Sequence, residues 1–151
     1  MMTLNLPPAD LRLSQREGNT MVFDFLRRRY VKLTPEEWVR QHFVHFLVHH
    51  KGYPQELLAN EVSLTLNSTS KRCDTVLYGT NASPLAIMEY KAPNIQLTQK
   101  VFDQITRYNI VLRVPYLMVS NGLQHYCCHV DYETNACTFL PEIPDYEVIK
   151  N

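Results

Sequence analysis

The stretch CDTVLYGTNASPLAIMEYK, residues 73–91, decides the fold predicted for this chain. It contains two strand-like segments, Cys73 to Tyr78 and Leu85 to Lys91, joined by a cluster of turn-forming residues at 79–84. The second segment is apolar until its last residues, as expected for a central strand that is buried on both faces. We therefore predict that the two segments pair as an antiparallel hairpin within a sheet.

Helices and further strands are predicted on both sides of this hairpin. Thr34 and Pro35 supply the N-cap and first position of a helix that Gly52 ends, and Thr98 caps a second helix that runs to about Leu112. Strands are expected at residues 60–66, 116–120 and 123–130, with a further candidate at 137–140. The order α-β-β-β-α-β-β predicts an α/β fold in which helices flank one mixed sheet.

The chain has 151 residues, enough for one domain with its own core. Residues 1–20 are polar and show no periodicity, so we expect a loosely attached arm, followed by a single domain at residues 21–151. The segment from Val22 to Val31 is compatible with a strand or a short helix, because its periodicity does not decide between them.

Composition excludes several classes of protein. Fifteen Lys and Arg balance fifteen Asp and Glu, so the chain has no general basic coat for nucleic acid, although a local basic strip is compatible with this balance. None of the four glycines lies in a phosphate-binding loop or a dinucleotide fingerprint, so we expect no ATP-driven motor in this chain. The N-terminus lacks the pattern of a signal peptide and no apolar run is long enough to span a membrane, so we expect a cytoplasmic protein without membrane contact.

Two groups of side chains are alternative metal sites. Residues 125–137 hold two histidines and three cysteines, but a strand would place adjacent ligands on opposite faces, which favours packed thiols over a zinc site. His42, His45 and His49 form one stripe of the first helix without a carboxylate, which favours a half-buried helix flank over a metal site.

Asp74, Glu89 and Lys91 are the candidate catalytic group. Side chains alternate along a strand, so Glu89 and Lys91 project from one face, and the hairpin can bring the Asp74 carboxylate beside Glu89. Two carboxylates can hold Mg²⁺ together with water and phosphate oxygens, while an adjacent lysine orients water and stabilises developing charge. This group therefore predicts metal-dependent phosphodiester hydrolysis.

The alternative is a surface ion pair, because an acid two residues before a lysine is common by itself. Two features favour the chemical interpretation. The charges end an apolar strand, where burying them is costly unless they have a role. On the following helix, Gln104 and Tyr108 are four residues apart and therefore share a face.

At these residues the chain resembles a known family. Asp74, Glu89-Tyr90-Lys91 and the segment 104–108 resemble the D…E-x-K and Q-x-x-x-Y motifs of the PD-(D/E)xK nuclease superfamily, and more narrowly the N-terminal nuclease domain of type I restriction enzyme R subunits. The resemblance spans roughly residues 34–148 and includes the words TPEEWVRQ (34–41), GYP (52–54), KRCD (71–74), KAP (91–93), FDQ (102–104) and SNG (120–122).

The resemblance implies a restriction-endonuclease-like fold and a nuclease centre with Mg²⁺ or Mn²⁺ as its cofactor. In this chain the matching residues are Asp74 and Glu89 as metal ligands, Lys91 beside them, and Gln104 and Tyr108 as residues that position DNA or support the centre.

Family members also use an acid from the first helix. Glu36 or Glu37 could fill that place, and helical phase does not choose between them, while Glu61 is a weaker candidate. Type I R subunits continue into an ATP-dependent translocase, which has no counterpart in this sequence.

A basic lining for phosphate groups is expected beside the centre. Lys71, Arg72 and Arg107 are the best candidates, whereas Arg27-Arg28-Arg29 is more simply explained as a solvated run. The sequence thus predicts a metal-dependent DNA endonuclease domain, with DNA and a separate motor or specificity subunit as partners. The alternatives are a catalytically silent DNA-binding or assembly module with the same fold, and a purely structural domain.

Overall fold

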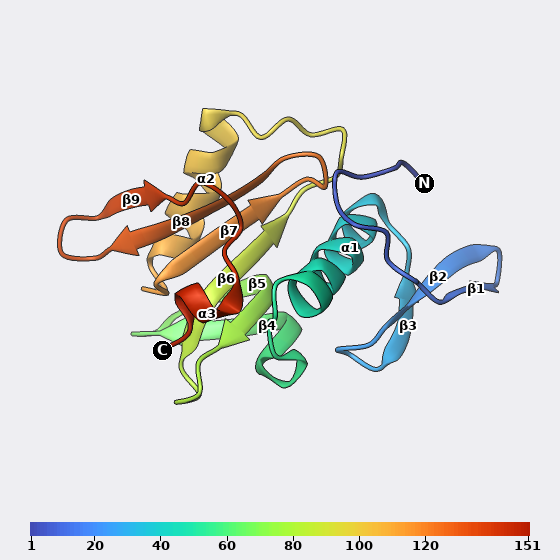
Figure 1. Ribbon diagram of the computed structural model, residues 1–151, viewed down its shortest axis with the longest axis horizontal. Helices are drawn as coiled ribbons and strands as arrows, with labels where there is room; N and C mark the ends of the chain where they lie inside the picture. Colours follow the sequence, from blue (N-terminus) through green and yellow to red (C-terminus); the bar gives the residue numbers. More distant parts are fainter.

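A six-stranded mixed sheet forms the centre of the molecule (Figure 1), in a computed structural model that describes residues 1–151. Neighbouring strands are antiparallel except β6 and β7, which are parallel because a helix connects them. In spatial order the strands are β4 (Leu58–Leu66), β5 (Thr69–Tyr78), β6 (Pro84–Tyr90), β7 (Tyr116–Ser120), β8 (His125–Asp131) and β9 (Ala136–Phe139).

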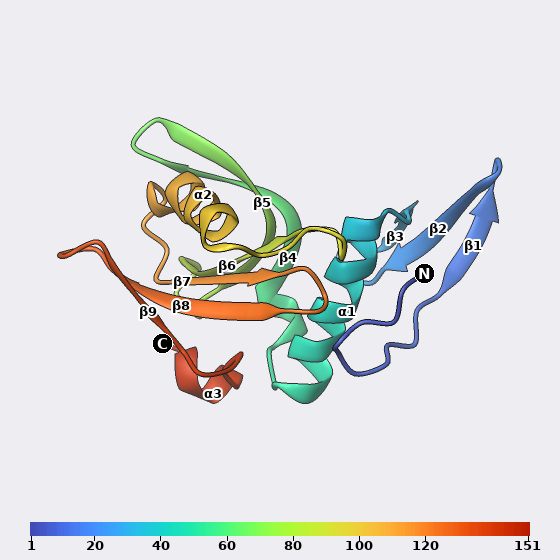
Figure 2. The ribbon, with the colours of Figure 1, turned by 90° about the horizontal axis from the view of Figure 1, so that it is seen from above.

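Helices cover both faces of this sheet, and they are α1 (Pro35–His50), α2 (Gln99–Ile110) and α3 (Tyr146–Ile149), with a single 3₁₀ turn at Gln55–Leu57. Figure 2 shows α2 and α3 on opposite sides of the sheet. Phe43 of α1 belongs to the same core cluster as Met88, and Ile105 of α2 belongs to the same cluster as Ile87. Because adjacent strand residues point to opposite faces, β6 is buried on both sides, as its apolar sequence predicts.

The local signals for α1 act as expected. The Thr34 hydroxyl accepts a hydrogen bond of 3.0 Å from the Glu37 backbone N–H, Pro35 occupies the first helical position, and Gly52 follows the helix with a φ of 75°. The helix has neither the length nor the apolar composition needed to span a membrane, and the same is true of the other helices.

The N-terminal segment differs from the loosely attached arm that was expected for residues 1–20. Three short strands, β1 (Leu13–Arg16), β2 (Asn19–Asp24) and β3 (Arg29–Lys32), form a separate antiparallel sheet beyond α1 (Figure 1), so residue 20 lies inside a strand. The segment before β1 is also attached, since the Asn5 N–H donates to the Gly122 carbonyl at 2.8 Å and Leu4 is buried. Strands of four to six residues are too short to show a clear period, and backbone hydrogen bonds hold them.

The segment from Val22 to Val31, left open between strand and helix, contributes to β2 and β3. The fifth predicted strand, 123–130, begins two residues later than expected, at His125. Its first residues belong instead to a turn, in which the Asn121 side-chain oxygen accepts hydrogen bonds from the N–H groups of Leu123 and Gln124.

Candidate active site

A cleft of about 410 Å³ lies between the β5–β6 hairpin and α2. It is lined by the candidate catalytic group Asp74, Glu89 and Lys91, by Gln104 and Tyr108, and by others from α1, β5, β6 and α2. The complete lining is Glu36, Arg72, Asp74, Glu89, Tyr90, Lys91, Val101, Gln104, Ile105, Tyr108 and Asn109.

Strand register brings the two carboxylates together. The β5–β6 ladder pairs Thr75 with Met88, so the next position along sets Asp74 opposite Glu89. There the ladder ends, and one oxygen of the Asp74 carboxylate accepts the Tyr90 N–H at 2.9 Å in place of a backbone carbonyl. The strand continues beside β7, where the Lys91 N–H donates to the Ser120 carbonyl at 2.9 Å.

Glu89 lies on the α2 face of β6, two residues after Ile87 and two before Lys91. Its Oε1 atom is buried and has no hydrogen-bond partner. Burial raises the pKa of Glu89 to about 9, the negative charge of Asp74 adds to this effect, and the positive charge of Lys91 opposes it. A cation bound between Asp74 and Glu89 would oppose this rise in the pKa of Glu89, because it favours the charged carboxylate.

The donor set fits a hard divalent cation. No group of three or more His, Cys, Asp or Glu side chains is placed to hold a metal. At this cleft the protein therefore offers Asp74 and Glu89, with room for water or phosphate oxygens. Mg²⁺ prefers this arrangement, because it binds through one or two carboxylates and keeps several waters.

Gln104 and Tyr108 both line the cleft from α2, so the predicted shared face is directed toward Asp74 and Glu89. Tyr108 is not part of the buried core that α2 forms with the sheet, because it is 44% exposed. Its ring instead lies against the Lys71 ammonium, whose nitrogen is 4.4 Å from the ring centroid.

The three acids left open by the sequence occupy different surroundings. Glu36 is exposed at the start of α1 and lines the cleft. Glu37 is buried and accepts hydrogen bonds from Arg27 at 2.7 Å and from Arg40 at 3.1 and 3.2 Å. Glu61 accepts from Arg40 at 2.6 Å and from Arg72 at 3.0 Å. Glu36 is thus the acid of the three that no cation already occupies.

Arg40 is a residue of the site region that the sequence did not single out. It is buried, and its Nη1 donates to the backbone carbonyl of Asp74 at 2.6 Å while its other nitrogens bind Glu37 and Glu61. Burial lowers the pKa of this guanidinium, but the two carboxylates outweigh it and hold the pKa above its ordinary value. The i, i+3 spacing of Glu37 and Arg40 was the available signal, and many solvated helix surfaces share it.

The predicted DNA contacts divide into two groups. Arg72 lines the cleft, and Lys71 lies beside it on the Tyr108 ring. Arg107 is exposed on α2 but is not among the residues that line the cleft.

Comparison with known proteins identifies the family. Residues 35–144 match the family described as the type I restriction enzyme R protein N terminus. The chain belongs to this family. This R-protein N-terminal domain is therefore of the family that its D…E-x-K and Q-x-x-x-Y residues predict. Among curated proteins no match is found.

A solved structure resembles this R-protein N-terminal domain in fold. It is a fragment of a protein described as an HsdR subunit of a type I restriction enzyme from Vibrio vulnificus YJ016. The TM-score is 0.55 at 21% sequence identity, and the match covers 78% of this chain and 24% of that chain. The likeness supports the predicted restriction-endonuclease-like fold, a mixed sheet flanked by helices.

Proposed function

We propose that this domain is a metal-dependent DNA endonuclease that hydrolyses phosphodiester bonds with Mg²⁺ or Mn²⁺ held by Asp74 and Glu89. The observation that carries the proposal is the Oε1 atom of Glu89, a buried acceptor without a partner beside a second carboxylate and a lysine. A buried polar atom is normally satisfied, so an unsatisfied one in a cleft is explained by a group that binds there.

Several residues in and beside the cleft have a role in this proposal. The Tyr90 N–H fixes the orientation of Asp74, and Arg40 fixes the backbone on which it stands. The bound ion would lower the pKa of a water and neutralise charge on the phosphate oxygens. Lys91 orients the attacking water and stabilises the transition state, while the side chains of Gln104 and Tyr108 contact DNA from α2.

Lys71 and Arg72 extend the cleft with positive charge for DNA phosphates. Because its proposed substrate is DNA, we also propose that the protein is cytoplasmic. A separate motor or specificity subunit is its proposed protein partner.

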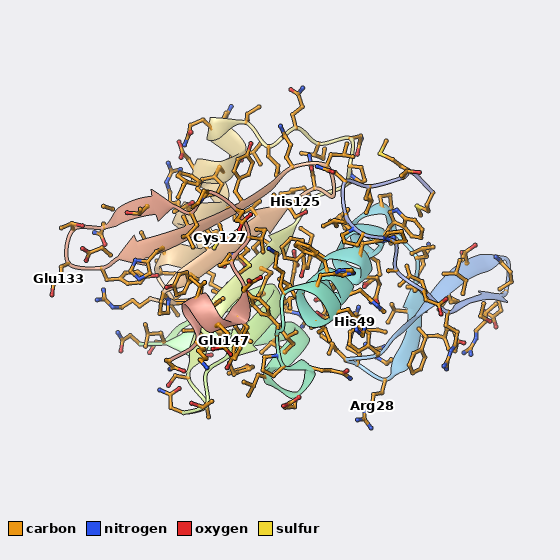
Figure 3. All side chains as sticks on the ribbon, in the orientation of Figure 1. Arg28, His49, His125, Cys127, Glu133 and Glu147 are labelled. Carbon is orange, nitrogen blue, oxygen red and sulfur yellow. The ribbon has the colours of Figure 1, made fainter.

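The test compares wild type with Glu89→Gln in nicking of supercoiled plasmid with Mn²⁺ or Mg²⁺ and without ATP. Glu133→Gln is the matched control, because Glu133 is exposed near the tip of the β8–β9 hairpin, far from α1 (Figure 3). We expect nicking by wild type and Glu133→Gln, and loss of nicking and of calorimetric metal binding in Glu89→Gln. Metal binding without nicking would favour a catalytically silent DNA-binding module, and the absence of both would contradict the proposal.

A further inference from the structure

The N-terminal sheet carries an excess of positive charge that the net charge of the chain conceals. Residues 12–32 contain six Lys and Arg against two Asp and Glu, a net charge of +4. Because the whole chain is neutral, all remaining residues together carry −4. The cations are therefore concentrated on an element that Figure 2 shows extending away from the main sheet, beyond α1.

Alternation along the strands sorts these residues between two faces. Val22 and Asp24 of β2 are completely buried, and Asp24 accepts a hydrogen bond from Asn60 of the main sheet, so this face is directed inward. The only acid of the three strands is thus on the inner face. The outer face presents three exposed cations, three half-buried apolar or aromatic side chains and no carboxylate, and these residues are Arg12, Arg16, Met21, Phe23, Tyr30 and Lys32.

Aromatic rings hold the two arginines of this outer face. The Arg12 guanidinium carbon is 5.0 Å from the centroid of Phe23, and that of Arg16 is 4.5 Å from the centroid of Tyr30. The two rings pack edge to face at 5.3 Å. Neither arginine forms a salt bridge, in contrast to Arg27, Arg40 and Arg72, each of which binds a carboxylate.

The position of this face relative to the cleft suggests one partner. Lys32 ends β3, and Glu36, four residues later, lines the cleft. Three residues of chain therefore separate the end of β3 from a residue of the cleft. Since the guanidinium groups already cover the rings, the face is suited to phosphate groups rather than to stacked bases.

We propose that the outer face of the N-terminal sheet binds the sugar–phosphate backbone of duplex DNA through Arg12, Arg16 and Lys32. This inference rests on the proposed function in so far as DNA is the substrate of the cleft. The contacts carry no sequence information, and they hold a duplex against the domain while the cleft engages one phosphodiester. Each phosphate neutralised by a cation releases counterions, so three contacts contribute about 2–3 to the slope of log affinity against log salt.

The test measures binding of a 30-base-pair duplex by fluorescence anisotropy in EDTA, where no metal is present for cleavage, over a range of KCl concentrations. The variant is Arg12→Gln/Arg16→Gln/Lys32→Gln in the 151-residue chain. The control is Lys51→Gln/Arg113→Gln/Lys150→Gln, which removes the same charge from other parts of the molecule. Circular dichroism establishes that both variants are folded.

We expect the N-terminal variant to raise Kd on the order of 10²-fold at 0.1 M salt and to lower the salt slope by about 2–3, with a much smaller change in the control. Unchanged affinity, or an equal loss in both variants, would overturn the inference. A failure of the proposed nuclease function can be distinguished from a failure of this inference. In the first case, wild type would bind DNA through this face without nicking it. Nicking activity combined with binding that the triple substitution leaves unchanged would instead refute the DNA-binding face alone.

Discussion

Glu89 is unfavourable in this protein unless a cation accompanies it. Its carboxyl is buried beside Asp74, one of its oxygens has no partner, and its pKa is raised to about 9. Burying an unpaired polar group costs about 1–3 kcal/mol, more if it is charged. Lys91 compensates only in part, since its positive charge lowers the pKa of Glu89 without bringing it to an ordinary value. A divalent ion would supply the remaining positive charge.

Lys91→Ala should separate metal binding from catalysis. Asp74 and Glu89 remain to hold Mg²⁺, while the cation that orients water and balances charge is lost, so we expect the nicking rate to fall by about 10²–10³. Asp74→Ala should lose metal binding and nicking together, because one carboxylate rarely holds Mg²⁺ alone. Calorimetry and plasmid nicking measure the two properties. Equal metal loss in both variants would contradict the role given to Lys91.

Glu36 and Glu37 are adjacent in sequence and should behave in opposite ways. Glu36→Gln should reduce nicking and change the free energy of unfolding by less than about 0.5 kcal/mol, because Glu36 is exposed in the cleft. Glu37→Gln should destabilise the fold by about 3 kcal/mol, since it removes the negative charge shared by half-buried Arg27 and buried Arg40. Urea unfolding and nicking assays distinguish the two variants, and a stability loss confined to Glu36→Gln would reverse the assignment.

At the scale of elements, one helix holds the strand that carries Asp74. The Asn60–Thr75 pair and the Asp24–Asn60 pair join β2, β4 and β5, while Arg40 of α1 reaches the Asp74 carbonyl. Glu61 lies opposite Asp74 in the β4–β5 ladder and has a φ of 57°, the left-handed region that a strand normally avoids. At this position of the β4–β5 ladder, the Asp74 carbonyl thus accepts a hydrogen bond from the Arg40 guanidinium.

Arg40→Ala should therefore be much more costly than the loss of a surface arginine. It leaves Glu37, Glu61 and a backbone carbonyl without their shared donor, and breaking a buried ion pair in this way costs about 3–5 kcal/mol. Arg29→Ala is the control, because Arg29 is exposed and forms no salt bridge, and its effect should lie within about 0.5 kcal/mol. Urea denaturation compares them, and equal midpoints would exclude Arg40 as the link between α1 and β5.

Elements with strong local signals could be predicted from the sequence, and those held by tertiary contacts could not. The capping residues Thr34 and Gly52 located α1, and the apolar run before Glu89 located the central strand. The N-terminal sheet was missed because its strands of four to six residues show no clear period. At the site, the face shared by Gln104 and Tyr108 followed from helical spacing, but the exposure of Tyr108 depends on how α2 lies over the sheet, which spacing does not contain.

At the scale of the whole molecule, the folded state contains histidines whose charged form is disfavoured by burial. Burial lowers the pKa of His125, opposed in part by the Asn5 carbonyl, and burial also lowers the pKa of His45. His125 has a partner on each ring nitrogen, the Asn5 carbonyl at 2.9 Å and the Ser120 hydroxyl at 2.7 Å. Neutral imidazole satisfies both if Nε2–H donates to the carbonyl and Nδ1 accepts from the hydroxyl. It thereby fastens the N-terminal segment to the β7–β8 turn.

This arrangement predicts a loss of stability in weak acid. Because the pKa of His125 is lower in the folded state, the unfolded chain binds more protons below about pH 6.5. The contribution of His125 to the free energy of unfolding is therefore complete above that pH. It decreases as the pH falls, by at most about 1.4 kcal/mol per pH unit. Glu89, whose folded pKa is raised, has the opposite slope over this range, and Asp24 and Glu61, whose pKa values are lowered, act below about pH 4.5. These contributions are common to wild type and His125→Gln, so the difference between the two proteins isolates His125.

We expect urea midpoints from pH 8 to 5 to show wild type losing stability relative to His125→Gln, whereas His129→Gln, at an exposed position, should follow wild type. A constant difference between wild type and His125→Gln across this range would mean that the fold does not lower the pKa of His125.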